Sequence, residues 1–179
     1  MSVQSILESV QSSAVAEWMR NTNPAMQVVE STHVLAAVLV LGTVLIADLR
    51  LLGITDSQRA FTRIGREALP LTWAAFAVAV VTGSLMFTTS AQTYFGNAAF
   101  QLKALALLAA GLNMLLFQAL TARGIASWDS GKPPRAARIA GVVSLVLWAA
   151  VVLLGRWIGF TKGYDFTIPP GLELEFPVP

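Results

Sequence analysis

The stretch from residue 25 to residue 48, AMQVVESTHVLAAVLVLGTVLIAD, decides the fold class of this chain. It is apolar almost throughout and lacks the narrow apolar stripe of a helix that packs in a soluble protein. A helix needs roughly 20 mostly apolar residues to cross a bilayer. Three further runs satisfy this requirement, at residues 69–89, 99–121 and 138–159. We therefore expect four membrane-spanning helices.

The composition supports the same class. The 179 residues are 55% hydrophobic and only 12% charged, with a mean hydropathy of +0.65, whereas soluble domains are about 25% charged. The absence of cysteine excludes disulfides, thiolate metal sites and cysteine nucleophiles. The predicted fold is an all-α integral membrane four-helix bundle that occupies residues 24–160.

The distribution of positive charge predicts the orientation of the bundle. Eight lysines and arginines lie in or beside the first and third connections between spans: Arg50, Arg59, Arg63, Arg66, Arg123, Lys132, Arg135 and Arg138. The other four lie on the opposite side: Arg20, Lys103, Arg156 and Lys162. The positive-inside rule then makes those two connections cytoplasmic and both termini periplasmic, in a bacterial inner membrane. Basic character here reflects orientation, and we expect no nucleic-acid partner.

The first 23 residues are predicted to form an amphipathic helix at the outer membrane interface. Apolar residues recur at helical spacing over residues 2–20, and Trp18 is suited to headgroup depth. This helix is interpreted either as a membrane-surface anchor or as a lid over an outward-facing site. The segment lacks the cationic start and continuous apolar core of a cleavable signal peptide.

The C-terminal tail, residues 161–179, is predicted to be extended and periplasmic. Leu172, Leu174 and Phe176 alternate with two glutamates, as in a half-buried strand. A single strand is not stable alone in water. We expect residues 163–179 either to dock onto a protein partner or a second copy of the chain, or to remain a loose tail.

Ionisable residues inside the spans mark the candidate site. His33, the only histidine, follows Glu30 by one helical turn and lies roughly 13 Å along the first span from its outer end. Lys103 in the third span and Arg156 in the fourth are expected near the same level, and Met86 ends the second span. Because charged groups are unfavourable in hydrocarbon, such a convergence commonly marks a functional site.

Several interpretations of this cluster remain open. His33 could ligate the iron of a b-type haem or a copper ion, with Met86 as a second, soft ligand and with Lys103 and Arg156 paired with haem propionates. Glu30 and His33 could instead begin a proton or ion path that continues to Asp48. In a purely structural interpretation, Glu30 pairs with Arg156 or Lys103 and His33 forms a hydrogen bond between helices. Asp48 and Arg50 are interpreted as ordinary charges at the inner interface.

Three short runs carry a resemblance to a known family. Glu30-Ser31-Thr32-His33, the run DLRLLG at residues 48–53, and Gly155-Arg156-Trp157 resemble an uncharacterised bacterial family of small four-helix inner-membrane proteins of unknown function. The layout is more distantly similar to the copper-resistance D-type membrane family. That second resemblance implies helix histidines that handle copper or haem.

These observations lead to one functional expectation and two alternatives. We expect a small membrane subunit of a redox assembly, in which His33 binds haem b and electrons pass between a periplasmic partner and quinone. One alternative is a non-catalytic structural subunit that docks a partner through its C-terminal tail. The other is a copper-handling protein that uses His33, Met86 and Met26.

Overall fold

Four long helices form the body of the protein. The computed structural model describes residues 2–55, 60–120 and 122–161. In chain order the long helices are α3 (Ala25–Leu52), α4 (Phe61–Thr89), α6 (Ala98–Leu120) and α7 (Arg135–Thr161). Each is long and apolar enough to cross a membrane. Because these described ranges also contain no strand, the prediction of an all-α four-helix bundle is confirmed.

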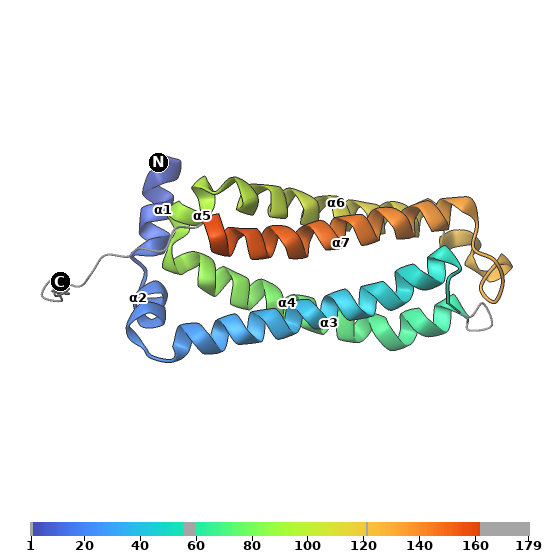
Figure 1. Ribbon diagram of the computed structural model, residues 1–179, viewed down its shortest axis with the longest axis horizontal. Coiled ribbons are helices and arrows are strands. Elements are labelled where there is room, and N and C mark those ends of the chain that lie inside the picture. Colours follow the sequence, from blue (N-terminus) through green and yellow to red (C-terminus); the bar gives the residue numbers. More distant parts are fainter. Residues whose placement is uncertain (1, 56–59, 121, 162–179) are drawn as a thin grey trace, which may run out of the picture.

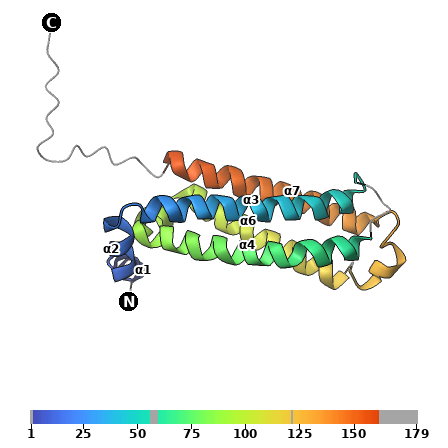
Figure 2. The same cartoon turned by 90° about the horizontal axis from the view of Figure 1, so that it is seen from below.

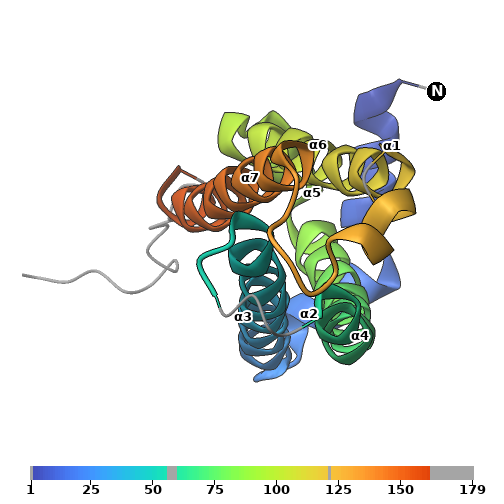
Figure 3. The ribbon, with the colours of Figure 1, turned by 90° about the vertical axis from the view of Figure 1, so that its right-hand side faces the viewer.

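The bundle consists of two antiparallel hairpins joined mainly through α3 and α7. α3 packs against α4, α6 packs against α7, and α3 also contacts α7 (Figures 1 and 3). α3 is therefore the most buried of the four helices. On α6, by contrast, Leu108 and Leu120 are 72% and 76% exposed. Side chains this apolar are stable on a surface only if lipid or another apolar surface covers them.

α4 begins eight residues before the predicted second span. The prediction counted only the apolar run from residue 69, but helical structure starts at Phe61. Asp129, in the connection to α7, explains the early start. Its carboxylate accepts hydrogen bonds from the backbone N–H of Thr62 at 2.8 Å and from the Thr62 hydroxyl at 2.6 Å. These bonds satisfy donors that the first turn of a helix leaves without a partner.

The predicted single N-terminal helix is two helices, α1 (Val3–Gln11) and α2 (Ala14–Asn21). Consecutive serines explain the break. The Ser12 hydroxyl donates to the Glu8 carbonyl at the end of α1, whereas the Ser13 hydroxyl accepts a hydrogen bond from the N–H of Ala16 at the start of α2. Serine side chains favour such terminal positions over helix interiors.

α1 and α2 lie across one end of the bundle, beside the short helix α5 (Ala91–Gly96) (Figures 1 and 2). Arg20 holds them there, because its guanidinium donates at 3.1 Å to the carbonyls of both Gln11 and Thr89. Met19 is buried, while Val3 and Trp18 are more than half exposed. The pair therefore covers the end of the bundle with one face and leaves an apolar face free.

The predicted C-terminal tail, residues 161–179, begins at the last residue of α7. Residues 162–179 lie outside the described part of the chain. The extended tail and its docking role through residues 163–179 therefore stay predictions.

Candidate functional site

His33 belongs to α3. Its side chain contacts α4, in the half of the bundle that α1 and α2 cover. Its ring is half-buried, whereas Glu30, one turn closer to the end of α3, is exposed. Nδ1 of His33 lies 3.0 Å from the carbonyl oxygen of Ala79 and 3.0 Å from the Thr82 hydroxyl oxygen, both on α4. The imidazole therefore links the two helices of the first hairpin.

These contacts define the protonation of the neutral ring. The Ala79 carbonyl can only accept a hydrogen bond, so Nδ1 must carry the proton. The Thr82 hydroxyl donates its own proton to the Val78 carbonyl at 2.7 Å and is thus free to accept from the same Nδ1–H. Nε2 is then the nitrogen with the lone pair. A histidine whose Nδ1–H is fixed by a carbonyl is the usual arrangement of a metal-ligating imidazole.

Gly83 provides the space in which the ring sits. A Cβ atom at this position would lie 3.0 Å from Cε1 of His33 and 3.4 Å from Nδ1. Ala75, Ala79 and Gly83 follow one another at intervals of four residues, a small-residue pattern typical of close helix approach in membranes. Sequence reasoning missed this surface of α4, although the pattern was available to identify it.

Lys103 is the second charged group in this part of the interior. It lies on α6, is half-buried, and its Nζ would be 3.3 Å from a Cβ at Gly155 of α7. Lys103 thus lies where α6 and α7 approach each other, in the second hairpin. Within the described residues, Glu30 forms no ion pair with Lys103 or Arg156, so the ion pair of the structural interpretation is not formed.

The structure does not bring Arg156 or Met86 into direct partnership with His33. The Arg156 side chain is exposed, and its guanidinium carbon lies 4.9 Å from the ring centroid of Phe160 on the same helix. Met86 is half-buried on α4, three residues beyond Gly83. In the described part of the chain, no group of three or more His, Cys, Asp or Glu residues is placed to hold a metal ion.

A second polar cluster lies toward the opposite end of α3, and here the sequence-based interpretation was wrong. Asp48 and Arg50 are not ordinary interfacial charges, because they are only 5% and 0% exposed. The Arg50 guanidinium donates to the carbonyls of Asp129 and Gly131 at 2.9 and 3.2 Å. The Asp48 carboxylate accepts a hydrogen bond from Ser144 on α7. Arg50 thus fixes the connection that caps α4.

Apolar residues separate the two polar clusters. Ala36 and Val40, which lie on α3 between His33 and Thr43, are 4% and 1% exposed. His33 and Thr43 are ten residues apart, which corresponds to about 15 Å along the helix. This is several times the length of a hydrogen bond. Along α3, buried apolar side chains therefore separate His33 from Thr43, whose hydroxyl accepts a hydrogen bond from Thr72 of α4 at 2.8 Å.

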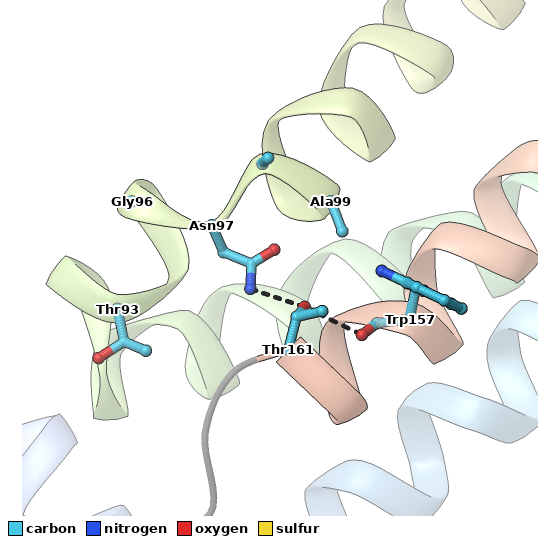
Figure 4. A pocket seen from close by; sticks show the side chains of 7 residues that line it. Thr93, Gly96, Asn97, Ala99, Trp157 and Thr161 are labelled. Carbon is cyan, nitrogen blue, oxygen red and sulfur yellow. Dashed lines mark hydrogen bonds between the residues drawn. The ribbon is translucent and has the colours of Figure 1, made fainter.

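Two surface cavities lie elsewhere. One, of about 340 Å³, is lined at the covered end of the bundle by Thr93, Gly96, Asn97, Ala98, Ala99, Trp157 and Thr161 (Figure 4). Within it the Asn97 amide donates to the Thr161 hydroxyl at 2.9 Å. The second, of about 410 Å³, lies at the opposite end, between the end of α3 and the start of α7. Neither is lined by His33.

Four long apolar helices, with a histidine hydrogen-bonded between two of them, define a small all-helical protein of the membrane type. Residues 24–161 match the model of DUF6644, a family of unknown function, and the chain belongs to that family. This match confirms the resemblance to an uncharacterised family. No curated protein and no solved structure matches the chain, and the similarity to the copper-resistance D-type family is not shown.

Proposed function

We propose that this protein is a small subunit of a redox assembly in the bacterial inner membrane, with His33 as an axial ligand of a b-type haem. The observation that carries the proposal is the hydrogen bonding of the imidazole. Ala79 and Thr82 occupy Nδ1, which leaves the Nε2 lone pair as the ligating group. When bound, the haem would supply a one-electron couple between a periplasmic donor and quinone.

The remaining residues fit such a group in part. Lys103 is a half-buried cation on α6, and its charge suits one propionate. Arg156 is directed toward Phe160, so we assign it no propionate. Glu30 is exposed at the covered end and influences the ring only through its charge. Because the chain has a single histidine, a second axial histidine would have to come from another copy or from a partner.

The orientation of the chain supports the same role. The helix ends that carry Arg50, Arg63, Arg66, Arg135 and Arg138 lie opposite α1 and α2. By the positive-inside rule we expect those basic ends in the cytoplasm and both termini in the periplasm. His33 would then lie in the periplasmic half of the membrane, within reach of a periplasmic partner.

A structural role is the second candidate. The hydrogen bonds of His33 to α4 are sufficient by themselves to account for a polar residue in this span. Under this proposal the protein is a non-catalytic scaffold, and its C-terminal tail docks the partner. Copper handling through His33 and Met86 is a further outcome of the same test.

Optical spectroscopy of protein purified gently from its native membrane separates these roles. The haem proposal expects a Soret band that shifts on reduction with dithionite and is absent in His33→Ala. Arg156→Gln is the matched control, because it alters a predicted site residue whose guanidinium packs over the Phe160 ring. Colourless protein with stoichiometric copper would support copper handling. Protein without either cofactor, which loses a partner when residues 163–179 are deleted, would support the scaffold.

A further inference from the structure

The end of α3 and the start of α7 lie at the loop end of the bundle (Figure 3). A groove with two arginines lies between them. Its volume is about 410 Å³, and it is lined by Leu52, Arg135, Arg138, Ile139, Val142 and Val143. None of these residues belongs to the region around His33, so the groove requires an explanation that does not depend on the haem proposal.

The groove separates charge from apolar surface along one face of α7. Arg135, Arg138, Ile139 and Val142 follow the i, i+3, i+4, i+7 spacing of a single helical stripe. Both arginines stand in the first turn, and the apolar residues continue toward the middle of the bundle. Ile139 and Val142 are 64% and 49% exposed. One end of the groove therefore presents positive charge, and the remainder presents an aliphatic wall.

The two guanidinium groups are available to a ligand. Both arginines are exposed, and neither side chain forms a hydrogen bond or ion pair with another described residue. Arg63, by contrast, is paired with Glu67 at 3.0 Å. Guanidinium groups bind phosphate oxygens in a bidentate manner, so the pair at the mouth of the groove suits a phosphodiester.

We infer that this groove binds an anionic phospholipid of the surrounding leaflet. The phosphodiester headgroup lies on Arg135 and Arg138, and one acyl chain follows Ile139 and Val142 toward the bilayer centre. Basic pockets between membrane helices recognise anionic headgroups in this manner. A soluble phosphate compound would leave the aliphatic wall unused, which is why the observations favour a lipid.

The experiment measures lipid binding to the full-length protein in mild detergent. Phosphatidylglycerol is titrated and its adducts are counted by native mass spectrometry, with phosphatidylcholine of the same chains as the neutral comparison. Glycerol phosphate and inorganic phosphate test whether the headgroup alone suffices. Removing one interfacial arginine is expected to weaken binding about five-fold, and removing two about thirty-fold. The double variant Arg135→Gln/Arg138→Gln should show the larger change.

Two further variants make the result decisive. Arg63→Gln/Arg66→Gln removes the same charge from α4 near the same end and should leave binding within about two-fold of the wild type. Val142→Trp fills the groove without changing charge and should weaken phosphatidylglycerol binding. It also serves as the test if the double arginine variant does not fold. Equal losses from both arginine pairs would mean diffuse attraction and overturn the inference. Equal affinity for phosphatidylcholine, or for glycerol phosphate or inorganic phosphate, would overturn it as well.

Discussion

Substituting Gly83 by alanine perturbs the contact on which the candidate site depends. The new Cβ would lie 3.0 Å from Cε1 of His33 and 3.4 Å from Nδ1, and the first of these distances is too short for a non-bonded carbon pair. The imidazole is rigid, so it must move away from α4 by several tenths of an ångström. Its 3.0 Å contacts with Ala79 and Thr82 would then lengthen toward the limit of hydrogen bonding.

The expected loss of stability follows from two contributions. Overpacking of a fitted interface costs about 1–3 kcal/mol, and an interhelical hydrogen bond in a membrane contributes about 0.6 kcal/mol. We expect Gly83→Ala to lower the free energy of unfolding by about 2 kcal/mol. In the background of His33→Ala the clash disappears, so the same substitution should cost less than about 0.5 kcal/mol, as expected for coupled neighbours.

Reversible unfolding in mixed micelles measures both numbers. Gly42→Ala on α3 is the matched control, because no described atom outside its own stretch of helix lies within 4 Å of the position that the new Cβ would occupy. Alanine also favours a helix over glycine by up to about 1 kcal/mol. If Gly83→Ala proves as well tolerated as Gly42→Ala, or equally destabilising with and without His33, the placement of the ring against α4 is refuted.

Three other predictions concern the contacts between helices and at the loop end. Arg50→Met should destabilise the protein by about 2–3 kcal/mol in the same unfolding assay, because the charged donors to the carbonyls of Asp129 and Gly131 are lost. A change below about 0.5 kcal/mol, roughly that of an ordinary surface substitution, would contradict this prediction. Hydrogen bonds from Thr62 hold the pKa of the Asp129 carboxyl below its usual value, so its contribution is present above about pH 4 and is lost as pH falls through the lower folded pKa. Unfolding midpoints measured between pH 6 and pH 3 should therefore fall less steeply in Asp129→Asn, and parallel curves would disprove the linkage. Gly141→Ala should destabilise the protein by about 1–3 kcal/mol, because its Cβ would lie 3.3 Å from the Asp48 carbonyl oxygen. Gly155→Ala is the control and should be tolerated, because its Cβ would meet the flexible end of Lys103. Equal effects of the two substitutions would show that α3 and α7 do not approach each other closely at Gly141.

The architecture was predictable because each span carries its own signal. An apolar run of bilayer length specifies a helix whatever its neighbours do, and apart from the start of α4 the ends of the four predicted spans lie within four residues of the ends of the four long helices. The early start of α4 was not predictable in this way. It depends on Asp129, which is remote in sequence and lies in the connection between the helices of the second hairpin.

The sequence gives a depth for each site residue but not the contacts of its side chain. Helical rise gives His33 and Lys103 a similar depth, whereas the approach of the Lys103 ammonium to Gly155 of α7 depends on how the helices pack. The rise per residue gives the depth of a side chain but not the direction in which it points. The contact of Arg156 with Phe160 was therefore not predicted. Burial of Arg50 was missed for a similar reason, since its partners are backbone carbonyls of a connection that no side-chain pattern identifies.

The reduced-minus-oxidised spectrum of His33→Gly, recorded with and without added imidazole, tests the proposed function most directly. Removing the side chain leaves an opening beside Gly83 that a free imidazole can fill. If Nε2 of His33 ligates haem, the Soret and α bands of the wild type should vanish in the variant and return with imidazole. Bands that persist in His33→Gly without imidazole, or a wild type that shows none although haem supply is verified, would contradict the account.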